Sequence, residues 1–221
     1  MTRPERIDCV LFDCDGVLVD SEPSAARVNR AVFESLGVPA TYEDCLALAG
    51  KSGASIPPVA ARYGVTITLE DFVAAHERLR EEGTVPKEVY LAPDMRLMPG
   101  VRGLLGRLRA AGVRTGLVST TVAPRLLAMA NRFGVASAFD VIVSGDMVER
   151  HKPDPEPYLT AMRWLGVAPE HAVVVEDSPS GVAAGVASGA YVLGFCGSAE
   201  VTQDVSAAHE RLASFFDFDL L

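Results

Sequence analysis

Acidic side chains directly follow two apolar runs of this sequence. Asp13 and Asp15 come after the run VLF, and Glu176 and Asp177 come after the run VVV. Carboxylates crowded at the end of a hydrophobic segment repel each other and lose solvation, so a bound cation would stabilise them. A set of oxygen ligands without cysteine or histidine favours Mg²⁺. Because Asp at the end of a strand is also a common turn residue, either pair alone leaves both interpretations open.

Two further polar stretches contain groups that suit an anion. Ser119, Thr120 and Thr121 follow the run GLV and precede a helical pattern. Hydroxyls at that position either cap the helix or hold a phosphate oxygen at its N-terminus, and the two roles are compatible. Lys152 stands in the segment HKPDP. A lone lysine is normally a solvated surface residue, but these prolines fix the backbone at the start of a helix and would aim the charge.

These groups can act together only if the elements before them end at a common edge. Five short apolar runs are predicted as strands, at residues 7–12, 113–118, 140–143, 172–175 and 190–194. Helical patterns at residues 101–111, 123–133, 155–165 and 180–188 alternate with the later runs. This alternation predicts a doubly wound, Rossmann-like α/β fold with a buried parallel sheet. Ligands bind such sheets outside the carboxyl ends of the strands, where the four polar stretches would meet.

One interval, from residue 23 to about residue 92, contains no predicted strand. Its helical patterns span residues 23–36, 42–48, 55–63 and 69–82, and each is followed by a glycine typical of a helix stop, at positions 37, 50, 64 and 83. We therefore predict an α-helical cap domain over residues 20–92, inserted into a Rossmann-like core of residues 1–19 and 93–221. Because the insert directly follows the segment of Asp13 and Asp15, it would form a lid over them.

The composition is that of a soluble globular protein, with 221 residues, 49% of them hydrophobic and 22% charged. A net charge of −9 argues against nucleic acid or an anionic membrane as a partner, since both need clustered Lys and Arg. It is compatible with a small phosphorylated metabolite. No apolar run reaches transmembrane length, and the N-terminal segment lacks the pattern of a signal peptide. We expect a cytoplasmic monomer.

Cysteines and histidines are not expected to act at the site. The spacing of the four cysteines matches neither a zinc site nor a disulfide framework, which fits a reducing compartment. Cys14, between the two aspartates, should point into the core. Three histidines, at positions 76, 171 and 209, lack ligand spacing and are expected to be exposed helix residues.

Four motifs occur in the order and spacing of one known family: FDCDGVLVDSE, GLVSTT, HKPDP and VVVEDSPSGVAAGVASGA. Over residues 7–194 the sequence thereby resembles the haloacid dehalogenase superfamily, and the helical insert stands where members with an α-helical cap have theirs. The resemblance implies a Mg²⁺-dependent phosphatase in which Asp13 is the nucleophile and forms an aspartyl-phosphate. Asp15 would protonate the leaving oxygen and then activate water, while its backbone carbonyl binds the metal.

The same resemblance assigns the remaining metal ligands. Asp177 would be the main ligand from the last motif, and Glu176 would bind directly or through water, together with Asp13 and Asp15. An acid at position 15 also separates this sequence from the dehalogenase and phosphonate-cleaving branches, whose leaving groups need no such proton donor. The resemblance therefore favours phosphate ester chemistry.

Substrate-binding roles follow in the same way. Ser119, with Thr120 beside it, would donate to the transferred phosphoryl group, and Lys152 would offset the charge of Asp13 and of the phosphate. Lys51 stands in the glycine-flanked cap segment LAGKSGAS. It is either a solvated lysine or a group that binds the anionic substrate.

The start GVLVDSEP resembles the group that contains small sugar-phosphate phosphatases and β-phosphoglucomutase. The mutases have a cap histidine near the position of Ala25 and a cap arginine near the position of Gly53, and this sequence has neither. We therefore predict hydrolysis of a small phosphomonoester, a sugar phosphate or a related metabolite. A β-phosphoglucomutase-like phosphotransferase is the alternative. A non-catalytic phosphate-binding protein is disfavoured, because the functional residues of all four motifs are present.

Overall fold

The computed structural model describes residues 2–198, 200–201 and 203–219. Its contacts divide the chain into a core unit, Met1–Asp20 with Leu97–Leu221, and a helical unit, Ser21–Arg96. The predicted insert, residues 20–92, begins one residue before the helical unit and ends four residues before the end of that unit. Each unit contains a buried hydrophobic cluster of its own.

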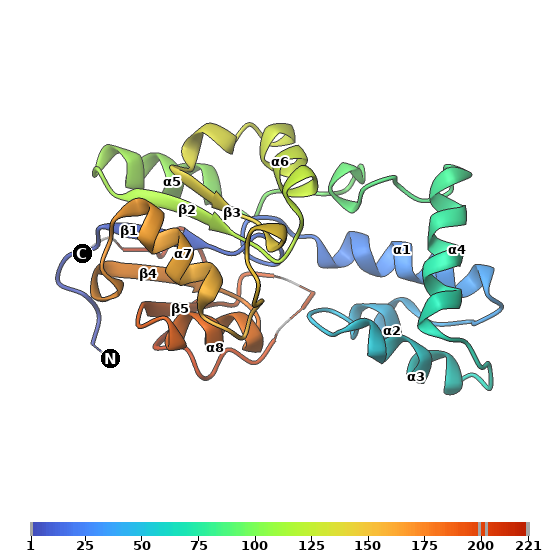
Figure 1. Cartoon of the computed structure of the whole chain (residues 1–221). Helices are drawn as coiled ribbons and strands as arrows, with labels where there is room; N and C mark the ends of the chain where they lie inside the picture. The colour runs from blue at the N-terminus through green and yellow to red at the C-terminus, as the bar shows by residue number, and fades with distance from the viewer. Residues whose placement is uncertain (1, 199, 202, 220–221) are drawn as a thin grey trace. The chain divides into compact units, whose positions relative to one another are not determined.

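The core unit is built on a six-stranded sheet in which neighbouring strands are parallel (Figure 1). The strands are β1 (Cys9–Phe12), β2 (Arg114–Val118), β3 (Val141–Val143), β4 (Ala172–Glu176), β5 (Tyr191–Phe195) and β6 (Glu210–Leu212). Their order across the sheet is β3-β2-β1-β4-β5-β6. This confirms the predicted doubly wound α/β fold, with β1 and β4 adjacent in the middle of the sheet. The sequence predicts the first five strands but not β6.

Four helices accompany the sheet: α5 (Val101–Ala110), α6 (Ala123–Arg132), α7 (Glu156–Leu165) and α8 (Pro179–Ala187). Helices α7 and α8 pack on one face, where alternate strand residues such as Leu11 and Val174 join Tyr158 in one buried cluster (Figure 1). Phe12 points to the opposite face and meets Phe215 edge to face, with 6.2 Å between the ring centres. Both faces of β1 are therefore buried, as its apolar sequence predicts.

The helical unit contains α1 (Glu22–Ser35), α2 (Tyr42–Leu46), α3 (Ile56–Ala61) and α4 (Leu69–Glu81). Phe33 of α1 and Phe72 of α4 meet edge to face in its core, with 4.9 Å between the ring centres. Thr41 and Thr68 form capping boxes at the starts of α2 and α4, and such a cap stabilises a helix by about 1 kcal/mol. The four glycines predicted to stop helices all have positive φ angles, between 65° and 75°, which confirms that prediction.

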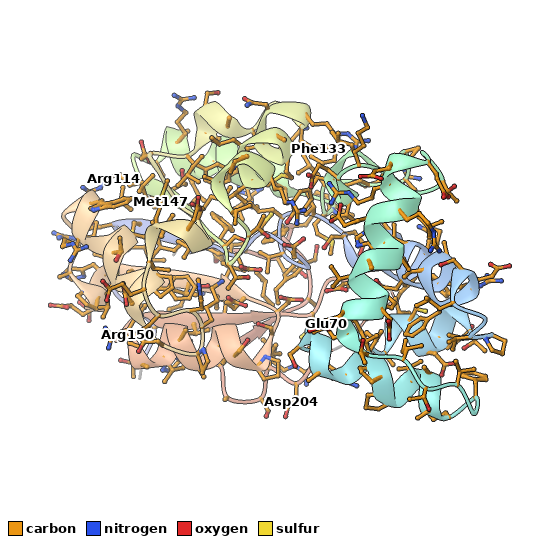
Figure 2. All side chains as sticks on the ribbon, turned by 45° about the vertical axis from the view of Figure 1, so that its right-hand side comes forward. Glu70, Arg114, Phe133, Met147, Arg150 and Asp204 are labelled. Atoms are coloured by element: carbon orange, nitrogen blue, oxygen red, sulfur yellow. The ribbon has the colours of Figure 1, made fainter. Side chains whose placement is uncertain are left out.

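Short 3₁₀ segments occupy connections between the longer elements. They are η1 (Gly53–Ser55), η2 (Val89–Leu91), η3 (Ala136–Ala138), η4 (Gly145–Met147) and η5 (Pro169–His171). Charged side chains such as Arg150 and Asp204 point outward from the core unit (Figure 2). Within the described part of the chain, none of the helices combines the length and the apolar character that crossing a membrane requires.

The sequence predicts the burial of Cys14 correctly, but it does not predict the burial of the three histidines. None of the four cysteines forms a disulfide with a described residue, and Cys14 is buried as expected. The histidine prediction is wrong, because each of the three is half-buried. His76 lies on α4, His171 ends η5, and His209 lies directly before β6. The ring of His209 stacks on Tyr191, with 5.0 Å between the ring centres, and this packing explains why it is not exposed.

Candidate active site

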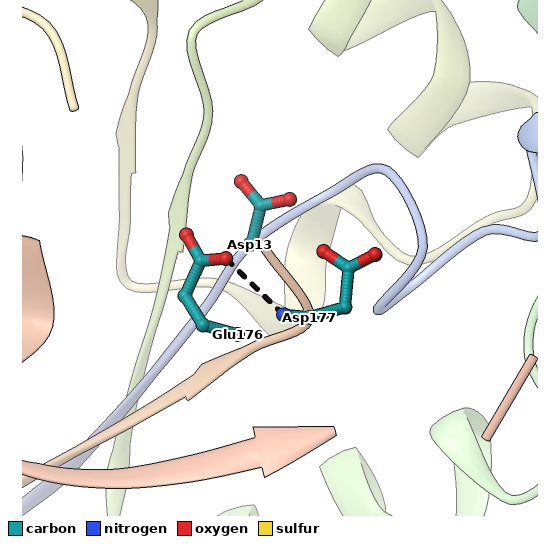
Figure 3. Close-up of side chains that lie close together, drawn as sticks. All are labelled: Asp13, Glu176 and Asp177. Atoms are coloured by element: carbon teal, nitrogen blue, oxygen red, sulfur yellow. Dashed lines mark hydrogen bonds between the residues drawn. The ribbon is translucent and has the colours of Figure 1, made fainter. Parts of the chain in front are cut away.

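Two neighbouring strands bring the acidic residues to one place. Phe12 of β1 pairs with Val175 of β4, and the N–H of Asp13 donates to the Val175 carbonyl at 3.0 Å. The hydrogen-bond ladder thus continues past the end of β1 and fixes Asp13 beside Glu176 and Asp177 (Figure 3). One carboxylate oxygen from each of these three residues lies within 4.8 Å of the other two.

One ammonium group lies against this cluster. Lys152 Nζ donates to Asp13 Oδ1 at 2.5 Å, to Glu176 Oε1 at 2.6 Å and to the Val118 carbonyl at 3.0 Å. All three N–H groups of the lysine are therefore used. The side chain of Lys152 is 5% exposed and that of Glu176 is 0% exposed. Because a buried charge is costly unless it is paired, these contacts hold the ends of β1, β2 and β4 together.

Glu156, in the first turn of α7, closes the segment that contains Lys152. Its carboxylate accepts from the N–H groups of Glu149 and Arg150 at 3.0 and 3.1 Å. Its own N–H donates to Asp154 Oδ1 at 2.9 Å. The prolines of this segment predict its rigidity. Glu156 is a second cause of that rigidity and is not predicted from the sequence.

Burial and crowding shift the protonation equilibria of the cluster. Burial raises the pKa of Asp13 to about 7; the charge of Lys152 opposes this rise, and the charges of Glu176 and Asp15 add to it. Burial alone would lower the pKa of Lys152, but the charges of Asp13 and Glu176 hold that pKa well above its ordinary value. Three carboxylates around one ammonium leave an excess of negative charge, which a divalent cation would balance.

Glu176 accepts hydrogen bonds on both of its oxygens. Oε1 accepts from Lys152 and from the buried hydroxyl of Tyr158, each at 2.6 Å. Oε2 lies 3.2 Å from the N–H of Asp177 (Figure 3). The same oxygen lies 3.4 and 3.2 Å from the N–H and the hydroxyl of Ser178. These donors take up the acceptor positions of the carboxylate. Asp13 and Asp177 are therefore better placed than Glu176 to bind a metal directly, and their oxygens suit a hard cation such as Mg²⁺.

Two glycines let the carboxylates approach the backbone closely. Gly16 has a φ of +76°, and a Cβ at this position would lie 2.0 Å from Asp177 Oδ2. A Cβ at Gly181 would lie 1.9 Å from the carboxyl group of Glu176. Only glycine fits at either position without displacing a carboxylate. Neither role is predicted from the sequence, although a glycine directly after the Asp-Cys-Asp segment is a usable signal.

The hydroxyl cluster after β2 does not cap the following helix. Ser119 is buried, and its Oγ accepts from the N–H of Thr121 at 3.1 Å. The first N–H of α6, that of Ala123, donates instead to Asp146 Oδ1 at 2.9 Å. The capping interpretation is therefore wrong, because a residue from the loop after β3 occupies the capping position.

The remaining residues predicted for the core unit lie at the same strand ends. Asp15 is half-buried, and its Oδ2 lies 3.5 Å from Thr121 Oγ1. Its side chain is not part of the three-carboxylate cluster, so its predicted contact with the metal would come from the backbone carbonyl. Thr120 is exposed.

Lys51 belongs to the helical unit and lines a pocket there. The pocket has a volume of about 410 Å³ and is also lined by Asp44, Ser55 and Arg62. Arg62 is paired with Asp44 at 2.8 Å, whereas Lys51 is exposed and makes no ion pair with any described residue. The pocket therefore has an excess of positive charge, which suits an anionic group.

Comparison with known proteins agrees with this architecture. A family model for haloacid dehalogenase-like hydrolases matches residues 7–189. The phosphorylated carbohydrates phosphatase of Thermotoga maritima is 34% identical over 186 residues, which cover 83% of this chain and 82% of that protein. The phosphoglycolate phosphatase of Salmonella typhimurium is 31% identical over 216 residues, which cover 86% of this chain and 81% of that protein.

A solved structure extends the likeness to three dimensions. A HAD family hydrolase from Deinococcus radiodurans R1, crystallised with bound phosphate and sodium, matches with a TM-score of 0.80 and 29% identity. The match covers 96% of this chain and 93% of that chain. Together, the family match and the relatives confirm the resemblance predicted from the four motifs and the prediction that the chain is an enzyme. The chain belongs to the haloacid dehalogenase-like hydrolases.

Proposed function

We propose that this chain is a Mg²⁺-dependent phosphatase that hydrolyses a small phosphomonoester, such as a sugar phosphate, through an aspartyl-phosphate on Asp13. The observation that supports this most is the Asp13 carboxylate itself, held at the end of the central strand by Lys152 and next to Asp177. The contact with Lys152 restrains the Asp13 carboxylate in one orientation. Carboxylates form covalent phosphoryl intermediates in other enzymes. The names of the curated relatives, both phosphatases, agree with the proposal.

The proposed reaction has two steps. In the first, Asp13 attacks phosphorus, the bond to the leaving oxygen breaks, and Asp15 gives that oxygen a proton. In the second, Asp15 takes a proton from a water molecule that attacks phosphorus, and inorganic phosphate leaves Asp13. Proton transfer by a positioned side chain typically contributes about 10²- to 10⁴-fold to the rate.

The other site residues would bind the metal ion or balance the charge of Asp13. Asp13, Asp177 and the backbone carbonyl of Asp15 would bind Mg²⁺, with Glu176 contributing through water because its oxygens already accept hydrogen bonds. Bound there, Mg²⁺ would remove the repulsion between the carboxylates and the phosphate dianion. Lys152 would favour the ionised form of Asp13, against the burial that raises the pKa of this carboxyl group.

The phosphoryl group and the rest of the substrate would be bound by different residues. Ser119 and Thr120 would donate to the phosphoryl oxygens, at the end of β2. We propose that the helical unit is a cap, and that Lys51 binds an anionic or hydroxylated part of the substrate. A small phosphorylated metabolite is the proposed partner. The cytoplasmic location and the monomeric state stay predictions.

The test uses purified protein and p-nitrophenyl phosphate. We expect hydrolysis with Mg²⁺, none after addition of a chelator, and none in the Asp13→Asn variant, whose circular dichroism spectrum should match that of the wild type. Near-normal turnover in this variant would contradict the role of Asp13. Incubation with β-glucose 1-phosphate and glucose 1,6-bisphosphate tests the mutase alternative: net formation of glucose 6-phosphate without release of inorganic phosphate would favour a phosphotransferase.

A further inference from the structure

The loop between β5 and β6 brings an amide side chain to the proposed metal ligands. Gln203 Nε2 donates to Asp177 Oδ2 at 3.1 Å. Gln203 belongs to none of the four motifs. We propose that Gln203 is a positioning residue, which orients the Asp177 carboxylate for Mg²⁺ binding. This inference rests on the metal site proposed above.

The Asp177 carboxylate needs such a partner because its terminal torsion is intrinsically loose. The last torsion angle of an aspartate side chain is broad rather than confined to staggered wells. On one side, Asp177 Oδ2 packs so closely on Gly16 that a Cβ there would lie 2.0 Å away. On another side, the same oxygen accepts from Gln203. Close packing and a hydrogen bond on the same atom together restrict rotation of the carboxylate.

The loop that contains Gln203 is anchored to the core two residues later. Val205 is 2% exposed and belongs to the buried cluster under the sheet. A Cβ at Gly194 of β5 would lie 2.7 Å from Val205 Cβ, so strand and loop pack tightly there. Asp204, between the two, points outward (Figure 2). The chain is therefore anchored to the core on the C-terminal side of Gln203, whose side chain extends toward Asp177.

The chemistry of an amide suits this role. Asp177 must keep its full negative charge in order to bind a divalent cation. A lysine or arginine in place of Gln203 would neutralise part of that charge and compete with the metal. A neutral amide donor orients the carboxylate and leaves the charge available. Hydrogen bonds to metal-binding carboxylates of this kind typically change metal affinity or activity by about 10- to 100-fold.

The test is isothermal titration calorimetry of Mg²⁺ into metal-free protein, for wild type, Gln203→Met and Ser206→Ala. Methionine has nearly the shape of glutamine but no N–H donor. Ser206 is an exposed residue of the same loop and provides the matched control. We expect Gln203→Met to raise the Kd for Mg²⁺ about 10- to 100-fold, and Ser206→Ala to leave it unchanged. At saturating Mg²⁺, kcat for p-nitrophenyl phosphate should be similar in all three proteins, and their metal-free melting temperatures should agree.

The possible failures are distinguishable. If wild type binds Mg²⁺ and Gln203→Met binds it equally well, Gln203 does not position Asp177, while the proposed function stands. If Gln203→Met lowers the metal-free melting temperature and kcat at saturating Mg²⁺ without changing the Kd, its role is structural and the inference is wrong. If wild type itself neither binds Mg²⁺ nor needs it for turnover, the metal site of the proposed function fails and this inference fails with it.

Discussion

At the scale of single residues, the buried ammonium group of Lys152 decides which variants are informative. If the Asp13 carboxylate is replaced by an amide, Lys152 still donates to Glu176 and to the Val118 carbonyl. Removal of Lys152 instead would leave Asp13 and Glu176 without their counter-charge, and breaking a buried ion pair typically costs about 3–5 kcal/mol. Asp13→Asn therefore tests the chemistry, whereas a Lys152 variant would test the fold as well.

Gly16 gives a prediction at the same scale. Gly16→Ala should weaken Mg²⁺ binding and turnover, because the new Cβ would lie 2.0 Å from Asp177 Oδ2 and displace that carboxylate. The variant should also lose about 1–2 kcal/mol of stability, because alanine at a left-handed φ is strained. The measurements are the Kd for Mg²⁺, kcat/KM, and the free energy of unfolding in urea.

Gly112 provides the control for this prediction. It has a φ of +72°, and no atom lies within 4 Å of a Cβ built there. Gly112→Ala should therefore show a similar loss of stability with normal Mg²⁺ binding and normal turnover. If the two variants lose activity equally, the contact between Gly16 and Asp177 has no special importance for the site.

At the scale of the elements, the sequence predicts the five strands that contain an apolar run. All residues of β1, β4 and β5 are buried, so each appears in the sequence as an uninterrupted apolar run with an acidic or glycine-rich end. Strand β6 has only three residues, two of them exposed and charged, so it has no such run. Its position depends on pairing with β5, a contact that no local pattern encodes.

The same distinction applies to the candidate site. The sequence can predict that three residues lie close together, Asp13, Lys152 and Asp177, because strand ends at one edge of a parallel sheet must meet. Tyr158 and Gln203 cannot, because their contacts with Glu176 and Asp177 depend on side-chain packing between distant segments. Tyr158 has the sequence context of an ordinary residue on the buried side of a helix.

His209 links β5 to β6 and gives a prediction about pH. The N–H of Val192 donates to His209 Nδ1 at 3.0 Å, so the imidazole must be neutral to accept this bond. Burial lowers the pKa of His209 below its ordinary value of 6.5. A lowered histidine pKa means that the stabilisation is complete above about pH 6.5 and is lost as the pH falls through the lower, folded-state pKa.

Urea unfolding at several pH values tests this prediction against His209→Gln, which keeps an acceptor atom but does not titrate. Between pH 7 and pH 5 the wild type should lose up to about 1 kcal/mol more stability than the variant, the usual value of one hydrogen bond. Parallel pH profiles for the two proteins would mean that the bond between Val192 and His209 does not contribute.

At the scale of the whole molecule, the chain has two units with separate hydrophobic cores. The core unit contains the complete set of residues proposed for phosphoryl transfer. The helical unit contains the pocket of Lys51, Ser55 and Arg62. Such a division would allow substrate preference to change through the helical unit while the chemistry in the core unit stays the same.

Lys51→Ala tests this division of labour. The variant should lower kcat/KM about 10- to 100-fold for the sugar phosphate that wild type hydrolyses best in a substrate screen, as expected for loss of a hydrogen bond to a charged group. It should scarcely affect p-nitrophenyl phosphate, which offers Lys51 no such partner. Lys87→Ala, at another exposed lysine of the helical unit, is the matched control. Equal losses for both substrates would mean that Lys51 serves the chemistry or the fold.

The pairing of β1 also determines when the site can form during synthesis. Cys9 of β1 pairs with Arg114 of β2 and with Ala172 of β4, so the strand that leads to Asp13 leaves the ribosome long before either partner. The whole helical unit is synthesised in the interval, and its own core allows it to fold first. Pairing between such distant segments is slow. A growing chain that has not reached β4 exposes an apolar strand with no partner on that side, which is a typical starting point for aggregation.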